Sequence, residues 1–163
     1  MKSVLYTRTL REEGMTAIDK IVYCQIAYYD LCGGQPHNGH ISLEDYAMSA
    51  NVSRRQLYYS KNTLTAKGYL DNDGHAVPLS DNDGRYFELL AESCLSGVAL
   101  ILYSYIAHLC KKYGWVDRRH SALAKDLCMS EKTINNALTR LYESGHILRQ
   151  RKGKQTLLSV NLP

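Results

Sequence analysis

The sequence repeats itself once, and this repeat constrains the possible folds more than any other feature. Residues 21–27 (IVYCQIA) match residues 101–107 (ILYSYIA) at a shift of 80, with four identities in seven positions. A second pair of blocks, at a shift of 77, aligns Ser53 with Ser130. The same shift aligns Ala47 with Ala124, Val52 with Met129, Leu57 with Ile134, Leu64 with Leu141 and Gly68 with Gly145. Each half of the chain is therefore expected to form the same supersecondary unit.

The first repeated block predicts a buried helix in each half. Apolar residues recur at three- and four-residue spacing over 18–29 and again over 98–109, which is the period of an amphipathic helix. Thr16 is placed to cap the first of these helices, and Gly33 and Gly34 would end it. The tyrosines in these segments are expected to belong to the core and not to a cofactor site.

The second block predicts two short helices joined by a tight turn. In the first half Ser42 would cap one helix, and Ser53 with Gln56 would form the capping box of the next. In the second half residues 121–127 would form the short helix, and Ser130 would cap its successor. The turns between the helices are expected at Asn51-Val52 and at Cys128-Met129.

A β-hairpin is expected after the longer helix of each half, which should end at a left-handed glycine, Gly68 or Gly145. The second hairpin would run through residues 146–148, turn, and return as the alternating strand 156–160. The first would begin at residues 69–70 and return over 85–90, with two Asp-Asn-Asp-Gly turn signals between. The predicted fold class is mainly α with small β-hairpins (α+β).

This order of elements, with its motif spacing, resembles the winged helix-turn-helix superfamily. The motif reads Ala47-x4-Val52-Ser53-x3-Leu57-x6-Leu64-x3-Gly68 in the first half and Ala124-x4-Met129-Ser130-x3-Ile134-x6-Leu141-x3-Gly145 in the second. The likeness covers nearly the whole chain and is similar to the winged-helix domains of phage and plasmid replication proteins and of small prokaryotic regulators. It implies two tandem domains, 1–90 and 91–163. Lys61 departs from the pattern, since its counterpart is Leu138.

Positive charge is concentrated in the second half. Residues 1–90 contain 9 Lys and Arg against 11 Asp and Glu, whereas residues 91–163 contain 11 against 5. A basic surface is the electrostatic requirement for binding a polyanion. The net charges of −2 and +6 therefore make the second half the stronger candidate for contact with DNA.

The resemblance implies specific DNA contacts, because in this superfamily the third helix usually enters the major groove and the wing contacts phosphates. In the second half the reading face would comprise Lys132, Thr133, Asn135, Asn136 and Arg140. Asn can bond to adenine and Lys to guanine acceptors. The basic wing would comprise Arg149, Arg151, Lys152 and Lys154. It should supply much of the salt-dependent affinity.

The first half offers a matching face, but the hairpin region beside it is acidic. Its residues would be Arg54, Arg55, Gln56, Tyr58 and Tyr59. The hairpin region beside it carries Asp71, Asp73, Asp81 and Asp83, which phosphates would repel. We therefore expect this wing to point away from DNA or to pack on the other domain or on a partner, and this half to be either a reading domain or an interaction domain.

No motif predicts catalysis, a cofactor or a metal site. The Asp-Asn-Asp-Gly tetrads lack the glutamate of a calcium loop, and Cys24, Cys32, His37 and His40 contain no paired Cys-x2-Cys. The His37-Asn-Gly-His40 segment is not the metal-binding pair of DNA-nicking initiators, and no triad, carboxylate pair or phosphate loop is present. We expect a protein that is not an enzyme.

Five widely spaced cysteines favour reduced core thiols, and neither a signal peptide nor an apolar run of membrane-spanning length is found. A cytoplasmic protein with no membrane contact is expected. The leading hypothesis is sequence-selective binding of double-stranded DNA, as a transcriptional regulator or a replication-associated protein of a prokaryote or mobile element. The alternative is a non-catalytic adaptor that binds a protein partner through the first domain. Whether the chain acts as a monomer or a dimer is left open.

Overall fold

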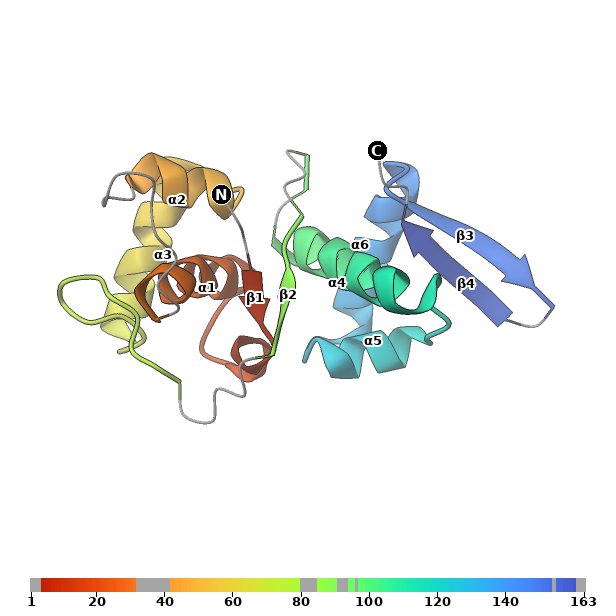
Figure 1. The fold of residues 1–163 in the computed structure, drawn as a ribbon, viewed down its shortest axis with the longest axis horizontal. Helices are drawn as coiled ribbons and strands as arrows, with labels where there is room; N and C mark the ends of the chain where they lie inside the picture. The colour runs from red at the N-terminus through yellow and green to blue at the C-terminus, as the bar shows by residue number, and fades with distance from the viewer. Residues whose placement is uncertain are drawn as a thin grey trace. The chain divides into compact units, whose positions relative to one another are not determined.

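A computed structural model describes residues 4–31, 42–79, 85–90, 94–95, 97–153 and 155–160. The chain divides into two compact units, Met1–Gly97 and Val98–Pro163, whose elements are labelled in Figure 1. Helices predominate, and the paired strands form two small antiparallel sheets of two strands each. The predicted class, mainly α with small β-elements, is confirmed.

The first unit is built around one central helix. Its elements are β1 (Val4–Tyr6), the 3-10 helix η1 (Arg8–Arg11), α1 (Ala17–Leu31), α2 (Leu43–Ser49), α3 (Arg54–Ala66) and β2 (Tyr86–Glu88). Helix α1 packs against α3, β1 and α2. Its buried side chains include Ile21 and Val22, which are 0% exposed, so the core of the unit lies along this helix (Figure 1).

Local capping signals account for where the helices of the first unit begin. The Thr16 N–H donates to Asp19 Oδ2 at 3.0 Å, and the Asp19 N–H donates back to Thr16 Oγ1 at 3.2 Å. Equivalent capping boxes open α2 at Ser42 and α3 at Ser53. Each box satisfies backbone donors that the first helical turn leaves unpaired. The predicted caps at Thr16, Ser42 and Ser53 are confirmed, while Gly33 and Gly34 lie outside the described residues.

The strand pairing of the first unit differs from the predicted hairpin. The Asp71 carboxylate accepts from the N–H groups of Asp73 and His75 at 3.0 and 2.9 Å. This tight turn brings the chain back at once, so that Leu70 pairs with Ala76. Strand β2 is then free to pair with β1, with Leu5 opposite Phe87. The return strand expected over 85–90 therefore joins the beginning of the chain.

The second unit contains a helical trio followed by a hairpin. Its elements are α4 (Gly97–Tyr113), α5 (His120–Asp126), α6 (Glu131–Glu143), β3 (Ile147–Lys152) and β4 (Gln155–Val160). Val116, between α4 and α5, exchanges backbone hydrogen bonds with Leu158 of β4 at 2.8 and 2.9 Å. The far end of the β3–β4 hairpin extends beyond the helices of its own unit (Figure 1).

Corresponding positions of the repeat adopt the same special backbone conformations. Asn51 and Cys128, in the turns between the short helices, have φ values of 50° and 53°. Gly68 and Gly145, which follow the longer helices, have φ values of 76° and 73°. Such positive values suit glycine and are tolerated by asparagine. The predicted turns and left-handed helix ends are confirmed in both units.

The departure at Lys61 has a structural explanation. Its counterpart Leu138 is 1% exposed, whereas Lys61 is only half-buried. The Lys61 Nζ lies close to Gly74 in the loop after α3. A Cβ at position 74 would be only 3.3 Å from this nitrogen. The ammonium of Lys61 thus lies beside the loop after α3, and this position does not require the apolar residue that its counterpart provides. Among the described residues, no helix is long and apolar enough to cross a membrane.

Candidate nucleic-acid interface

Helix α6 presents a polar face because its apolar residues are all drawn to the opposite side. Ile134, Ala137, Leu138 and Leu141 are buried at the three- and four-residue spacing of one helical stripe. Lys132, Asn135, Asn136 and Arg140 are exposed. The helix thus brings these four predicted contact residues onto its solvent-facing surface, where their side chains can meet a ligand.

Thr133, the fifth residue predicted for this face, takes part in the N-terminal cap of α6. Its N–H donates to Ser130 Oγ at 3.1 Å, and the two hydroxyl oxygens lie 2.8 Å apart. Thr133 is also half-buried. It therefore belongs to the cap that starts α6, and the four exposed residues form the available surface.

The cations of the β3–β4 hairpin are divided between its two faces. In the antiparallel register Arg149 lies opposite Leu158 and Arg151 opposite Thr156, so these two side chains share one face. Lys152 lies on the other face, where its Nζ is 6.0 Å from the centre of the Trp115 ring. All three cations are exposed. Lys154 lies outside the described residues.

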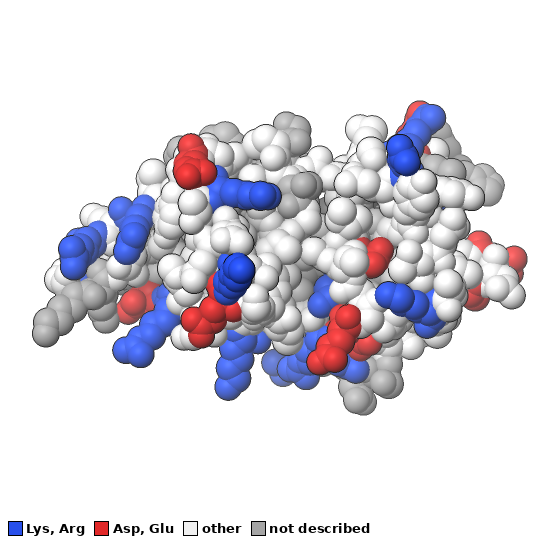
Figure 2. Space-filling view, turned by 180° about the vertical axis from the view of Figure 1, so that it is seen from behind, with Lys and Arg blue, Asp and Glu red and all other residues white. Residues whose placement is uncertain are grey.

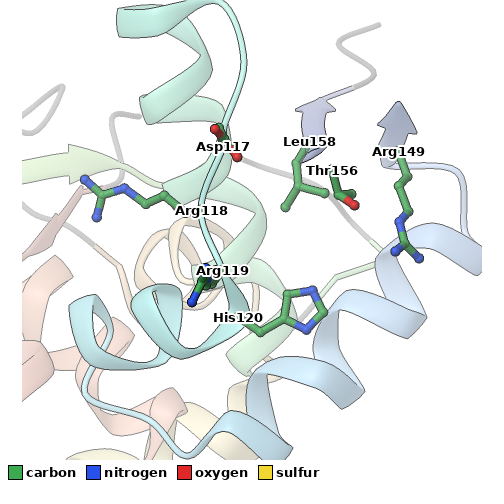
Figure 3. A pocket seen from close by; sticks show the side chains of 7 residues that line it. All are labelled: Asp117, Arg118, Arg119, His120, Arg149, Thr156 and Leu158. Carbon is green, nitrogen blue, oxygen red and sulfur yellow. The ribbon is translucent and has the colours of Figure 1, made fainter. Parts of the chain in front are cut away.

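A pocket of about 640 Å³ lies between the start of α5 and the hairpin. Its lining residues are Asp117, Arg118, Arg119, His120, Arg149, Thr156 and Leu158. Figure 3 shows the His120 ring and the Arg149 guanidinium directed toward one another, while Arg118 extends away. Arg118 is instead paired with the Asp126 carboxylate. The sequence analysis missed Arg119 and His120, although the run Arg118-Arg119-His120 before α5 could have drawn attention to them.

Arg149 also lies close to α6. Burial raises the pKa of Tyr142, near the end of that helix, and the positive charge of Arg149 opposes this shift. A charge that influences Tyr142 is within electrostatic reach of the helix. Helix α6 and β3 are also in contact, so the hairpin lies beside the C-terminal end of this helix.

The matching face of the first unit is exposed but largely engaged within the unit. Arg54 forms an ion pair with Glu44 of α2. The Arg55 guanidinium lies 5.5 Å from the centre of the Tyr59 ring. Gln56 completes the capping box, where its Oε1 accepts from the Ser53 N–H at 3.0 Å. Tyr58, 64% exposed, projects most freely. Most of the predicted readers of this unit thus already have intramolecular partners.

The acidic loop after α3 forms a tight turn that is held by hydrogen bonds to the Asp71 carboxylate. The backbone N–H of His75, assisted by that of Asp73, holds the pKa of Asp71 below its usual value. Asp71 is therefore a stable negative charge beside the exposed Asp73. Asp81 and Asp83 lie outside the described residues. This loop is unsuited to contact with phosphates, as the sequence indicated.

Cations in the two units differ in how many have acidic partners. In the first unit Arg8 pairs with Glu12, and Arg54 with Glu44. In the second unit, within the part of the chain that the structure describes, Lys132, Arg140, Arg149 and Arg151 are in no ion pair. Figure 2 shows Lys and Arg interspersed with Asp and Glu over one face of the molecule. Arg118 of the second unit is itself paired with Asp126, so the contrast is between Arg54 and the cations of the predicted contact surface of the second unit.

Neither a metal site nor a relationship to known proteins gives further evidence about the function of this surface. Within the described ranges, no group of three or more His, Cys, Asp or Glu side chains could hold a metal ion. Cys32, His37 and His40 are outside those ranges. Comparison with protein-family models, with curated proteins and with solved structures finds no match to this chain.

Proposed function

We propose that this chain is a tandem winged-helix protein that binds double-stranded DNA sequence-selectively, with the second unit making the principal contact. One observation carries the proposal. The exposed side of α6 and the adjoining hairpin combine hydrogen-bonding side chains with cations that have no acidic partner among the described residues. A helix that reads bases beside a basic hairpin that binds phosphates is the arrangement expected of a winged helix on DNA.

Helix α6 would supply the base contacts. Asn135 and Asn136 are exposed in its N-terminal half, and an Asn side chain can bond to N6 and N7 of adenine together. Lys132, one turn earlier, can reach the O6 and N7 acceptors of guanine. The major groove is about 12 Å wide and admits one helix. These three residues would therefore determine which base pairs are preferred.

The hairpin would supply affinity that is independent of sequence. Arg149 and Arg151 project from one face of β3, and each can pair bidentately with a phosphate. Displacement of condensed counterions by such contacts makes binding weaken as salt rises. Occupation of an operator or of a replication origin, in a prokaryote or a mobile element, would follow from this binding without catalysis.

The test is binding of a labelled random-sequence duplex over a range of salt concentrations. The variant Arg149→Ala, Arg151→Ala, Lys152→Ala should reduce the magnitude of the log–log salt slope by about two to three, since each phosphate contact contributes about 0.9. The control Lys111→Ala, Lys112→Ala, Arg118→Ala removes the same charge from the same unit and should change the slope by less than about one. Absence of wild-type binding at low salt would overturn the proposal.

A second candidate, partner binding by the first unit, has one observation in its favour. Met48 and Tyr58 are 76% and 64% exposed on α2 and α3. A pocket of about 500 Å³ beside Tyr58 is lined by Ser42, Glu44, Arg54, Leu57, Tyr58, Lys61 and Asn62. Large exposed apolar side chains beside a pocket are typical of protein interaction surfaces. Salt titrations of variants that lack the cations of α3 or of α6 separate this candidate from a second reading domain.

A further inference from the structure

The pocket beside the hairpin brings together cations from two separate segments. Arg119 and His120 come from the start of α5, and Arg149 comes from β3. All three residues are exposed at the surface. In Figure 3 the His120 ring and the Arg149 guanidinium converge on the space in front of Thr156. These side chains come from segments that are distant in sequence, so only the folded unit brings them together.

The chemistry of the pocket suits a phosphate group. Arginine presents a planar set of donors that matches two phosphate oxygens, and an imidazole N–H and a threonine hydroxyl can donate to a third. Arg119 precedes α5 as its N-cap residue, and its side chain makes no capping hydrogen bond. The Arg149 guanidinium and the His120 imidazole are thus directed into this space, and Arg119 lines it from the start of α5.

The acidic side chains nearby do not cancel this positive charge. Asp126 pairs with Arg118 and also accepts from the Tyr105 hydroxyl at 3.0 Å. Among the described residues that line the pocket, Asp117 is the one carboxylate. Arg118 and Asp126 thus neutralise each other, and Arg119 with Arg149 outweighs Asp117. A volume of about 640 Å³ leaves room for the sugars that flank a backbone phosphate.

From this convergence we infer that the pocket binds a phosphate group, and that its source is a backbone phosphodiester of the bound duplex. Arg119 and His120 are then contact residues that extend the interface from the hairpin to the start of α5. The assignment of the source rests on the proposed function. The chemistry of the pocket, which a free phosphate ion would share, does not.

The first arm of the test measures duplex binding by Arg119→Gln. A lost phosphate contact should weaken binding about five- to tenfold at moderate salt, equally for duplexes of different sequence, and should lower the salt slope by about one. Lys125→Gln is the matched control, because it removes one exposed positive charge from the last turn of α5, outside the pocket. His120→Gln, a second variant, should also weaken binding. Circular dichroism of each variant checks that it is folded.

The second arm follows backbone amide shifts of residues 117–120 in the intact protein by NMR. A short duplex should shift them, and inorganic phosphate should do so only at much higher concentration, with sodium chloride of equal ionic strength as reference. If duplex binds but Arg119→Gln and Lys125→Gln weaken it equally, the pocket site is wrong and DNA binding stands. If no duplex binds yet phosphate shifts these amides, the phosphate pocket stands and the DNA source is wrong. If neither ligand shifts them, the inference is overturned.

Discussion

A buried thiol in the first unit shows how strongly one residue is affected by its surroundings. Burial raises the pKa of Cys24 to about 11. Its Sγ donates to Thr9 Oγ1 at 3.3 Å and accepts from the Tyr6 N–H at 3.4 Å. The thiolate is the reactive form of cysteine. At pH 8 Cys24 should therefore be both protonated and covered.

We predict that iodoacetamide at pH 8 modifies Cys24 at least roughly a hundredfold more slowly than it does in the urea-unfolded chain, where the thiol pKa is about 8.5. The exposed Cys128 serves as the internal control and should react early in the folded protein. Peptide mapping by mass spectrometry gives both rates. Equal rates at the two cysteines would show that the first unit opens easily or that Cys24 is not buried.

A polar pair in the core of the same unit gives a prediction about stability. Ser60 is 4% exposed and Asp19 is 5% exposed. The Ser60 hydroxyl donates to Asp19 Oδ1 at 2.5 Å. Ser60→Ala would leave that buried oxygen without this donor, which should lower the free energy of unfolding by about 1 to 3 kcal/mol.

The control lies one turn along the same helix. The Thr63 hydroxyl donates to the Tyr59 carbonyl at 3.0 Å at an exposed site, so Thr63→Ala should change stability by less than about 0.5 kcal/mol. Urea unfolding of both variants, followed by circular dichroism, supplies the comparison. A Ser60→Ala midpoint equal to that of Thr63→Ala would mean that the Asp19 carboxylate does not need the Ser60 hydroxyl.

Among the elements, the tight turn between α5 and α6 carries a backbone strain that its counterpart in the first unit avoids. Cys128 has a φ of 53°, and the equivalent Asn51 has a φ of 50°. Asparagine tolerates this left-handed conformation better than other residues with a Cβ, and a β-branched residue tolerates it worst. Cys128→Asn should therefore stabilise the second unit, by roughly 0.5 kcal/mol, and Cys128→Val should destabilise it by about 1 kcal/mol.

Thermal unfolding of the two Cys128 variants measures this difference directly. Both substitutions remove the same exposed thiol, so each controls for its loss. The expected order of midpoints is Asn, then wild-type Cys, then Val. A higher midpoint for Val than for Asn would indicate that the turn adopts a negative φ, and the correspondence between the two turns would fail.

The elements that sequence reasoning located are those whose signals are local. Ser53 and Ser130 begin helices through bonds to residues three positions away, and Gly145 follows a helix because of its own φ. The pairing of Val4–Tyr6 with Tyr86–Glu88 was not predicted, since it joins the two ends of the unit. That pairing depends on the Asp71 turn, which returns the chain before a longer hairpin can form.

In the candidate site, too, the local features were predictable from the sequence and the long-range contacts were not. The buried stripe of Ile134 and Leu138 determines which face of α6 is exposed, and periodicity alone reveals it. Periodicity does not reveal partners. The ion pair that engages Arg54 and the convergence of His120 with Arg149 both join segments distant in sequence. Sequence reasoning therefore found the residues of the surface more successfully than the relations among them.

At the scale of the whole molecule, the two repeated units have different electrostatic properties. The first unit pairs Arg54 with Glu44 and carries the acidic turn at Asp71. The second, in its described residues, leaves Lys132 and Arg149 without acidic partners. Because exposed cations without partners dominate binding to DNA, the two helix pairs should contribute unequally despite their shared design.

The double variants Arg54→Gln, Arg55→Gln and Lys132→Gln, Arg140→Gln make this inequality measurable. Each removes two cations from the third helix of one unit. On a random-sequence duplex the first pair should change the salt slope by less than about one, because Arg54 is already neutralised by Glu44 and Arg55 lies over Tyr59. The second pair should lower the slope by about one to two, since neither cation has an ion-pair partner among the described residues.

Retained folding of both double variants, checked by circular dichroism, is required for the comparison. Equal losses of slope would show that both units lie on the duplex and that the intramolecular partners of Arg54 and Arg55 yield to phosphate. A small loss for the first unit and a large one for the second would leave the exposed Met48 and Tyr58 surface available for a protein partner while the second unit holds DNA. The same pair of titrations thus decides between two reading domains and one reading domain joined to an interaction domain.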